Sequence, residues 1–153
     1  MSIYTFIKKD HRNVEELLAK IEKLEYDQIE LRNDLFNKLQ AKILVHSKAE
    51  EKIFYSPLQR FSLTEEEIKH AKEEHAKVEH MLERLSDSSL NGAGWFHLFT
   101  TMAATIRHHI REEESQIFED AEVELSSEKA QEMEIAMKNE ERKIEHNIHP
   151  HMR

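Results

Sequence analysis

Two segments of this 153-residue chain carry the same pair of chemically active residues, a histidine followed four positions later by a glutamate. The pairs are His46 with Glu50 and His109 with Glu113, and apolar residues flank each pair at helical spacing. Residues four apart lie on one face of an α-helix, so each pair is predicted to lie on a buried face. Burying an ionisable group is costly unless the group is paired or binds an ion. Both pairs are therefore candidate metal ligands.

Two more histidines interrupt apolar patterns singly. His11 lies between Ile7 and Val14, and His75 lies one turn before Val78. A single buried histidine is more often a hydrogen-bonded core residue than a ligand. In a chain with 11 histidines and 31 acidic residues, some His-x-x-x-Glu pairs also arise by chance. The metal interpretation therefore depends on whether the fold brings these residues together.

Helix-breaking residues are few, since only two glycines and two prolines occur in the chain. Apolar residues at three- and four-residue steps predict helices over about residues 3–24, 27–57, 64–85 and 95–117, and a weaker pattern predicts one over 126–146. The second helix is expected to bury Leu31, Leu35, Leu39, Ile43 and Ile53. Short connections make successive helices antiparallel. We expect an all-α fold, an up-down-up-down four-helix bundle over residues 1–122, with residues 123–153 as an additional C-terminal helix packed on the bundle or in a dimer contact.

In such a bundle the candidate ligands lie at one height. Counting about 1.5 Å per residue from one end of the bundle places all six residues about 8–16 Å from that end. The six residues are His11, His46, Glu50, His75, His109 and Glu113. Two His-x-x-x-Glu pairs suit a two-metal site in which each glutamate can bridge the ions. Imidazole and carboxylate without thiolate favour iron, manganese or zinc over calcium or copper(I).

Other ionisable residues are weaker candidates. Glu74 and Glu79 lie beside and one turn after His75, where either could add a ligand or a proton path. His70 and His108 are predicted to face solvent. The C-terminal tail adds three more histidines that could hold metal loosely, His146, His149 and His151.

Composition excludes several classes of function. Lys plus Arg total 22 against 31 for Asp plus Glu, and this net charge of −9 argues against nucleic acid as a ligand. Zero cysteines exclude disulfides, thiol nucleophiles and thiolate metal sites. No targeting segment or membrane span is apparent, so we expect a cytoplasmic protein with no membrane partner.

The chain resembles the hemerythrin-like, or HHE cation-binding, family from about Tyr4 to Phe118. The resemblance rests on four stretches: Lys9-Asp10-His11, HSKAEEKIFYSP from His46 to Pro57, Glu74-His75, and HIREEESQIF from His109 to Phe118. It implies a non-haem di-iron centre, with two iron ions bridged by an oxo or hydroxo group and by Glu50 and Glu113. Manganese or zinc are alternative metals. Members that repair iron–sulfur centres or act in ubiquitin ligases carry further domains, so this chain resembles a stand-alone member.

The chain departs from the oxygen-carrying hemerythrins at two positions. Those proteins have a second histidine one turn from the third-helix histidine, and an aspartate five residues after the fourth-helix histidine. Here Ala71 and Glu79 flank His75, and Glu113 follows His109 by four residues. A centre with fewer histidines favours redox turnover or exchangeable ligands over reversible oxygen carriage.

Three functions remain open. The centre could bind O2, NO or peroxide for storage, delivery, sensing or detoxification. It could instead be a di-iron oxidoreductase that reduces NO or peroxide or uses O2 to oxidise a small substrate, or it could store or buffer iron. The sequence assigns no catalytic residue and no electron donor, and it leaves open whether the protein is an enzyme and whether it forms a homodimer.

Overall fold

The computed structural model describes residues 2–148, and all regular structure within these residues is helical. The elements in chain order are α1 (Ile3–Glu22), α2 (Ile29–Glu50), η1 (Glu51–Tyr55), α3 (Ser56–Leu58), α4 (Glu65–Leu85), α5 (Gly92–Glu112), η2 (Glu113–Ile117), α6 (Phe118–Glu124) and α7 (Ser127–Ile148). Among the described helices, none is long and apolar enough to cross a membrane.

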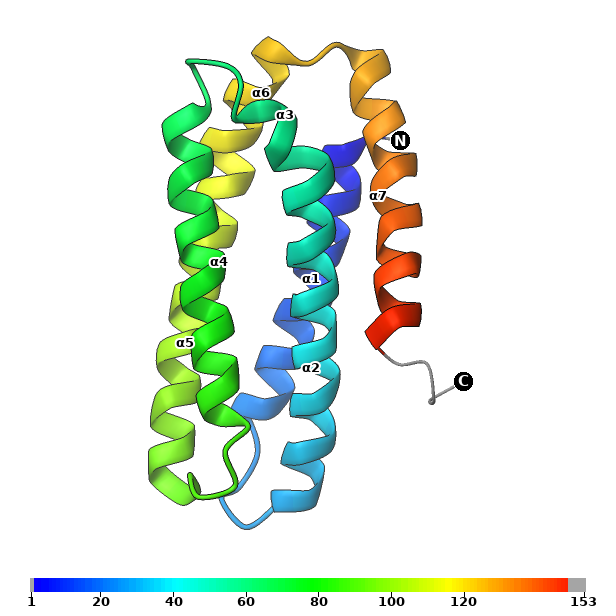
Figure 1. Ribbon diagram of the computed structural model, residues 1–153. Coiled ribbons are helices and arrows are strands. Elements are labelled where there is room, and N and C mark those ends of the chain that lie inside the picture. Colours follow the sequence, from blue (N-terminus) through cyan, green and yellow to red (C-terminus); the bar gives the residue numbers. More distant parts are fainter. Residues whose placement is uncertain (1, 149–153) are drawn as a thin grey trace.

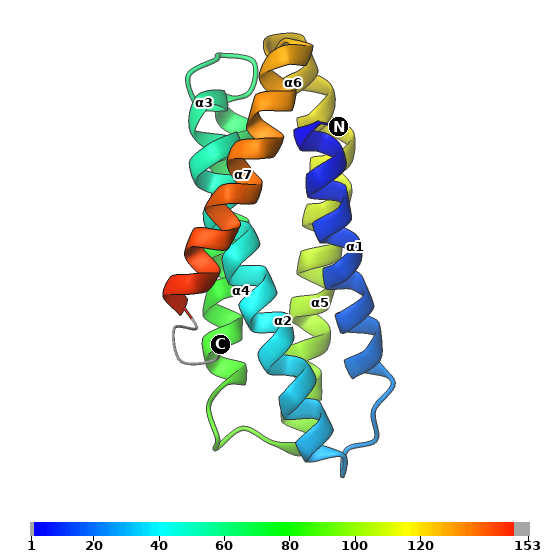
Figure 2. The same cartoon turned by 90° about the vertical axis from the view of Figure 1, so that its right-hand side faces the viewer.

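Helices α1, α2, α4 and α5 run alternately in opposite directions and form a four-helix bundle (Figure 1). The additional helix α7 lies along the outside of this bundle and packs against α1 and α2 (Figure 2). Its apolar residues Ala130, Met133 and Met137 are buried. The predicted all-α bundle with an extra C-terminal helix is confirmed.

A layer of polar residues divides the apolar core into two parts. Along α1, Ile3 and Ile7 belong to one apolar cluster, whereas Val14, Leu18 and Ile21 belong to the other. His11 lies between the two clusters and is itself buried. The candidate ligands therefore occupy the middle of the core, where apolar side chains shield them on both sides.

Two π-helical turns interrupt the long helices at this layer, and both lie on the side of the apolar cluster that contains Ile3 and Ile7. The first, η1, begins directly after Glu50, and the second, η2, begins at Glu113. A π-helical turn bonds residues five apart instead of four, and such turns are frequent at functional sites. The sequence pattern predicts unbroken α-helices here, so both turns are a correction to it.

The buried stripe of α2 also differs from the prediction. Leu31 is 46% exposed, whereas Phe36 is 4% exposed and packs in the core with Leu39 and Ile43. The apolar stripe is continued by Phe36 because its ring packs edge-on against Trp95, with ring centroids 5.7 Å apart.

Candidate metal centre

The fold brings all six predicted ligands into one buried cluster, with no side chain more than 9% exposed. Glu50 and Glu113 are completely buried. Four helices supply the residues: α1 gives His11, α2 gives His46 and Glu50, α4 gives His75, and α5 with η2 gives His109 and Glu113.

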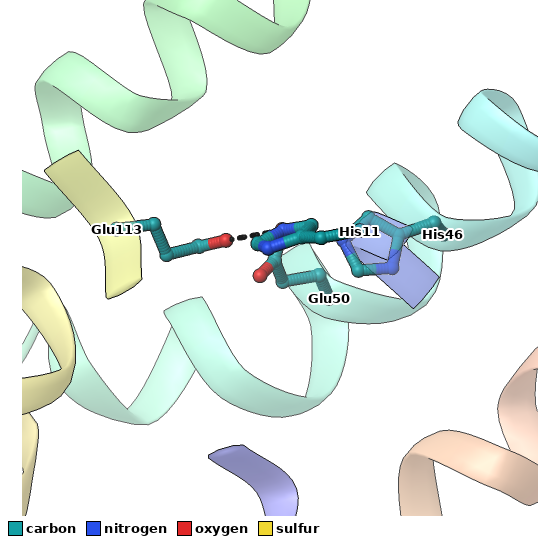
Figure 3. A group of neighbouring side chains, drawn as sticks. All are labelled: His11, His46, Glu50 and Glu113. Carbon is teal, nitrogen blue, oxygen red and sulfur yellow. Dashed lines mark ion pairs between the residues drawn. The ribbon is translucent and has the colours of Figure 1, made fainter. Parts of the chain in front are cut away.

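The four imidazoles form two groups, His11 with His46 and His75 with His109. One oxygen of each glutamate lies between the two groups. Glu50 Oε1 lies 3.4 Å from His46 Nε2 and 3.3 Å from His75 Nε2. Glu113 Oε1 lies 3.0 Å from His11 Nε2 and 3.8 Å from His109 Nε2. Figure 3 shows the group formed by His11, His46 and the two glutamates, with the His11–Glu113 ion pair dashed. Each glutamate thus contacts one histidine of each group.

Five inward-facing atoms of this cluster make no hydrogen bond, and four of them only approach one another in the ion pairs given above. They are His11 Nε2, His46 Nε2, both Oε atoms of Glu50, and Glu113 Oε1. Buried polar atoms are nearly always satisfied, so a group of unsatisfied ones at a single place requires an explanation. All five are nitrogen or oxygen atoms of the types that ligate transition metals. The residues present therefore fit a bound cation.

The other ring nitrogen, Nδ1, of each of the four cluster histidines contacts a carboxylate. Nδ1 of His11 lies 2.7 Å from Glu114, and Nδ1 of His46 lies 2.7 Å from Asp10. Nδ1 of His75 lies 2.7 Å from Glu51, and Nδ1 of His109 lies 2.8 Å from Glu74. An Nδ1–H donated to a carboxylate fixes the ring and leaves Nε2 free for a metal.

These outer carboxylates form a closed ring around the bundle. Each of them is adjacent in sequence to a candidate ligand on its own helix, and each bonds the histidine of the neighbouring helix. Asp10 on α1 contacts α2, Glu51 in η1 contacts α4, Glu74 on α4 contacts α5, and Glu114 in η2 contacts α1. The pairs link all four helices at the height of the cluster.

Charge pairing shifts the pKa values of the cluster. Burial works to lower the pKa of His11, but its contacts with Glu113 and Glu114 outweigh burial and raise the pKa to about 9. Burial also works to lower the pKa of His75, but its contacts with Glu50 and Glu51 outweigh burial and raise the pKa to about 9. Burial works to raise the pKa of Glu50, but His46 and His75 hold it well below its usual range. A cation entering this cluster must therefore displace protons from the imidazoles.

Tyr55 adds a phenol to the cluster, which the sequence reasoning missed. Its hydroxyl donates a hydrogen bond to Glu113 Oε2 and lies 3.4 Å from His109 Nε2. Burial and the nearby carboxylates hold the pKa of this hydroxyl well above its ordinary value. Tyr55 is the last residue of η1, five positions after Glu50. A π turn brings residues five apart onto one face of the helix, whereas an α-helical pattern with steps of three and four residues does not predict this.

The remaining candidates lie outside the inner cluster. Glu74 takes the outer position beside His109, whereas Glu79 forms no hydrogen bond or ion pair with any of the six residues in the described structure. His70 and His108 are exposed, as predicted. Glu141 of α7, which the sequence did not single out, is buried and lies 3.8 Å from His46 Nδ1. Of the tail histidines, His149 and His151 lie outside the described residues.

A small cavity adjoins the metal-ligand cluster on the side of the apolar cluster that contains Val14. Its volume is about 40 Å³, and its walls are the four histidines, Glu74, Ser47 and the side chains of Val14, Ile43, Val78, Ile106 and Ile110. A water molecule needs roughly 10–15 Å³ by the same measure, so the space suits a ligand of a few atoms.

Comparison with known proteins gives consistent results. The family model described as the hemerythrin HHE cation-binding domain matches residues 2–121. The fold is similar to the crystal structure of a hemerythrin HHE cation-binding domain-containing protein from Mycobacterium kansasii, with a TM-score of 0.82 and 21% sequence identity. That alignment covers 96% of this chain and 89% of the other. The search of curated proteins gave no significant match.

Proposed function

The chain belongs to the hemerythrin HHE cation-binding family, and we propose that its buried cluster holds two iron ions that bind O2, NO or peroxide. The observation that carries this proposal is the set of unsatisfied ligand atoms around Glu50 and Glu113. One ion would be held by His11 and His46, the second by His75 and His109, with the two glutamates between them.

Such a pair of iron ions would supply both a position for a small ligand and electrons for its reduction. The chain's own residues provide the surroundings. The outer carboxylates orient the imidazoles, and Tyr55 holds a proton on its hydroxyl oxygen beside Glu113. Val78, Ile106 and the other apolar cavity walls exclude bulk water.

The size of the cavity favours a diatomic or peroxide ligand over an organic substrate. A drug-sized ligand occupies a pocket of about 300–1,000 Å³, whereas this cavity measures about 40 Å³. Bulk iron storage is likewise disfavoured, because the space beside the ligands does not accommodate a mineral core.

A second candidate function is reduction of NO or peroxide. The specific observation in its favour is Tyr55, whose hydroxyl proton lies within the cluster and is held by Glu113. Reduction of either ligand consumes protons, and the hydroxyl is placed to deliver one. Replacement of Tyr55 by Phe should then slow turnover while iron content is kept.

The test is to load the protein with iron without oxygen and to record its visible spectrum as O2, NO or peroxide is added and removed. We expect a ligand-dependent absorption change. A reversible change supports a binding protein, whereas irreversible oxidation of the bound iron with loss of the ligand supports an oxidoreductase. An iron-loaded protein that shows no change with any of the three ligands contradicts the proposal.

A variant with a smaller cavity sharpens this test. Val78→Leu adds volume to a cavity wall, and Val45→Leu adds the same volume to a buried valine that does not line the cavity. Both variants should retain iron. Only Val78→Leu should weaken the absorption change, because the ligand competes with the added carbon for space.

A further inference from the structure

A second pair of His-x-x-x-Glu motifs lies on the surface next to the buried centre. His70 and Glu74 are four residues apart on α4, and His108 and Glu112 are four residues apart on α5. The spacing is the same as that of the buried pairs, but here the side chains of His70, His108 and Glu112 are 61%, 55% and 43% exposed. Two copies of the spacing therefore lie in the core and two more lie beside them toward the surface.

The two surface motifs converge because α4 and α5 pack against each other. His70 Nε2 lies 3.6 Å from Glu74 Oε2 on its own helix and 3.8 Å from Glu112 Oε2 on the other. The second oxygen of Glu112 lies 3.1 Å from His108 Nε2, which extends the cluster outward. Ligand atoms about 2.0–2.2 Å from one metal ion are separated by about 3–4 Å. The spacing of His70, Glu74 and Glu112 matches this requirement.

Glu74 connects the surface cluster to the buried centre. Its side chain is 10% exposed, and Oε1 lies 2.8 Å from Nδ1 of His109. Its other oxygen, Oε2, faces His70. The other three outer carboxylates have no exposed histidine as a second partner in the described structure; Asp10, for example, uses its second oxygen for Lys42. A line of ligating side chains thus runs from solvent to the centre only along the α4–α5 seam.

We propose that His70, Glu74 and Glu112 form a second, solvent-accessible site for a divalent transition-metal ion, and that this site supplies the buried centre. One imidazole and two carboxylates with open positions suit Fe²⁺, Mn²⁺ or Zn²⁺ held with bound water. Weak, exchangeable binding is what transfer requires. The net charge of −9 favours the approach of cations. The supplying role rests on the proposed function of the centre, whereas the surface site itself does not.

The experiment compares His70→Ala/Glu112→Gln with the wild type and with a control on α4, Glu79→Gln/His80→Ala. The control removes the same residue types from positions that belong to neither group of candidate ligands. Glu74 is left intact because it also holds His109. Metal-free protein is titrated with Zn²⁺ alone, and the titration gives the number of Zn²⁺ ions bound per chain in the tight and in the weak class of sites. The wild type and the control should bind one weak ion more than the surface variant.

The rate of iron loading tests the supplying role separately. Metal-free protein is mixed with limiting Fe²⁺ under argon, and iron that resists a chelator is measured over time. The surface variant should load more slowly than the control and should reach the same final iron content.

The outcomes separate the two claims. Equal Zn²⁺ stoichiometry in the surface variant and the control overturns the surface site. Loss of the weak ion with an unchanged loading rate overturns the supplying role. If the wild type retains no chelator-resistant iron, the proposed function of the centre fails, while the Zn²⁺ count still decides whether the surface site exists.

Discussion

Each histidine of the centre uses its two ring nitrogens differently. Nε2 faces the inner cluster, and Nδ1 contacts a carboxylate from the neighbouring helix. The inner nitrogen would bind metal, and the outer contact would only hold the ring in place. Substitutions at the inner and outer positions should therefore have different effects.

Removal of an inner ligand should remove metal and stability together. His46→Ala and Glu113→Ala are each expected to lose most of the iron and to lower the melting temperature of the iron-loaded protein. The physical reason is that an ion bound only by the folded state stabilises it. Metal analysis and thermal unfolding measure both effects, and unchanged iron content in both variants would refute the ligand assignment.

Removal of an outer carboxylate should weaken metal binding without abolishing it. Asp10→Asn keeps the size of the side chain that holds His46 but removes its charge. Iron affinity should fall about 10–100-fold, while saturating metal still gives the wild-type content. A competition titration against a chelator measures the affinity. Asp34→Asn, at an exposed position on the same bundle, is the matched control and should have no effect.

A carboxylate pair away from the centre gives a pH-dependent prediction. Burial and the neighbouring Asp120 raise the pKa of Glu67 from 4.5 to about 7. Between these values the folded state binds more protons than the unfolded state, so stability falls as pH rises through about 7. Glu67→Gln mimics the protonated form and should raise the melting temperature at about pH 8 more than at about pH 5. A difference that is equal at both values, or larger at the lower pH, would contradict the pairing.

The six inner residues were predictable because their positions follow α-helical spacing on apolar faces. Among the outer carboxylates the sequence singled out only Glu74, because each of them bonds a histidine on another helix and the sequence does not show which neighbour it faces. Asp10 and Glu51 look like ordinary solvated acids in the sequence. Their adjacency to His11 and Glu50 is the feature that could have identified them, since residues beside a ligand lie close to the adjacent helix.

At the scale of elements, the π turns and α7 complete the site. Turn η1 brings Tyr55 to the cluster, and α7 places Glu141 near His46 on the outside of the bundle. Apolar periodicity predicted the long helices and the extra helix correctly. It missed the π turns because one inserted residue leaves a pattern of three- and four-residue steps nearly unchanged, and it placed Leu31 in the core because side-chain periodicity alone does not fix where a stripe ends.

The packing of α7 can be tested by one pair of substitutions on the same helix. Met137 is completely buried, whereas Ile135 is 60% exposed. Met137→Ala should lower the free energy of unfolding by about 2–5 kcal/mol, because it leaves a cavity against the bundle. Ile135→Ala should have little effect. Urea unfolding at fixed metal content measures both, and equal effects would mean that α7 does not pack as described.

At the scale of the whole molecule, a charged layer separates two apolar clusters. The four-helix bundle positions the ligands, and the Nδ1–carboxylate pairs join its helices at the same height. This arrangement buries several ionisable groups in the core. Buried charges of this kind destabilise the fold unless they are paired or bind a metal ion. The proposed function consequently requires two ions in that layer.

The most direct measurement is anomalous diffraction at the iron absorption edge from crystals of the iron-loaded protein. Two peaks about 3.5–4 Å apart are expected, one beside His11 and His46 and the other beside His75 and His109, with Glu50 and Glu113 between them. A further weak peak beside His70 would belong to the surface site. A single peak, or no peak in the buried layer, would contradict the two-ion centre.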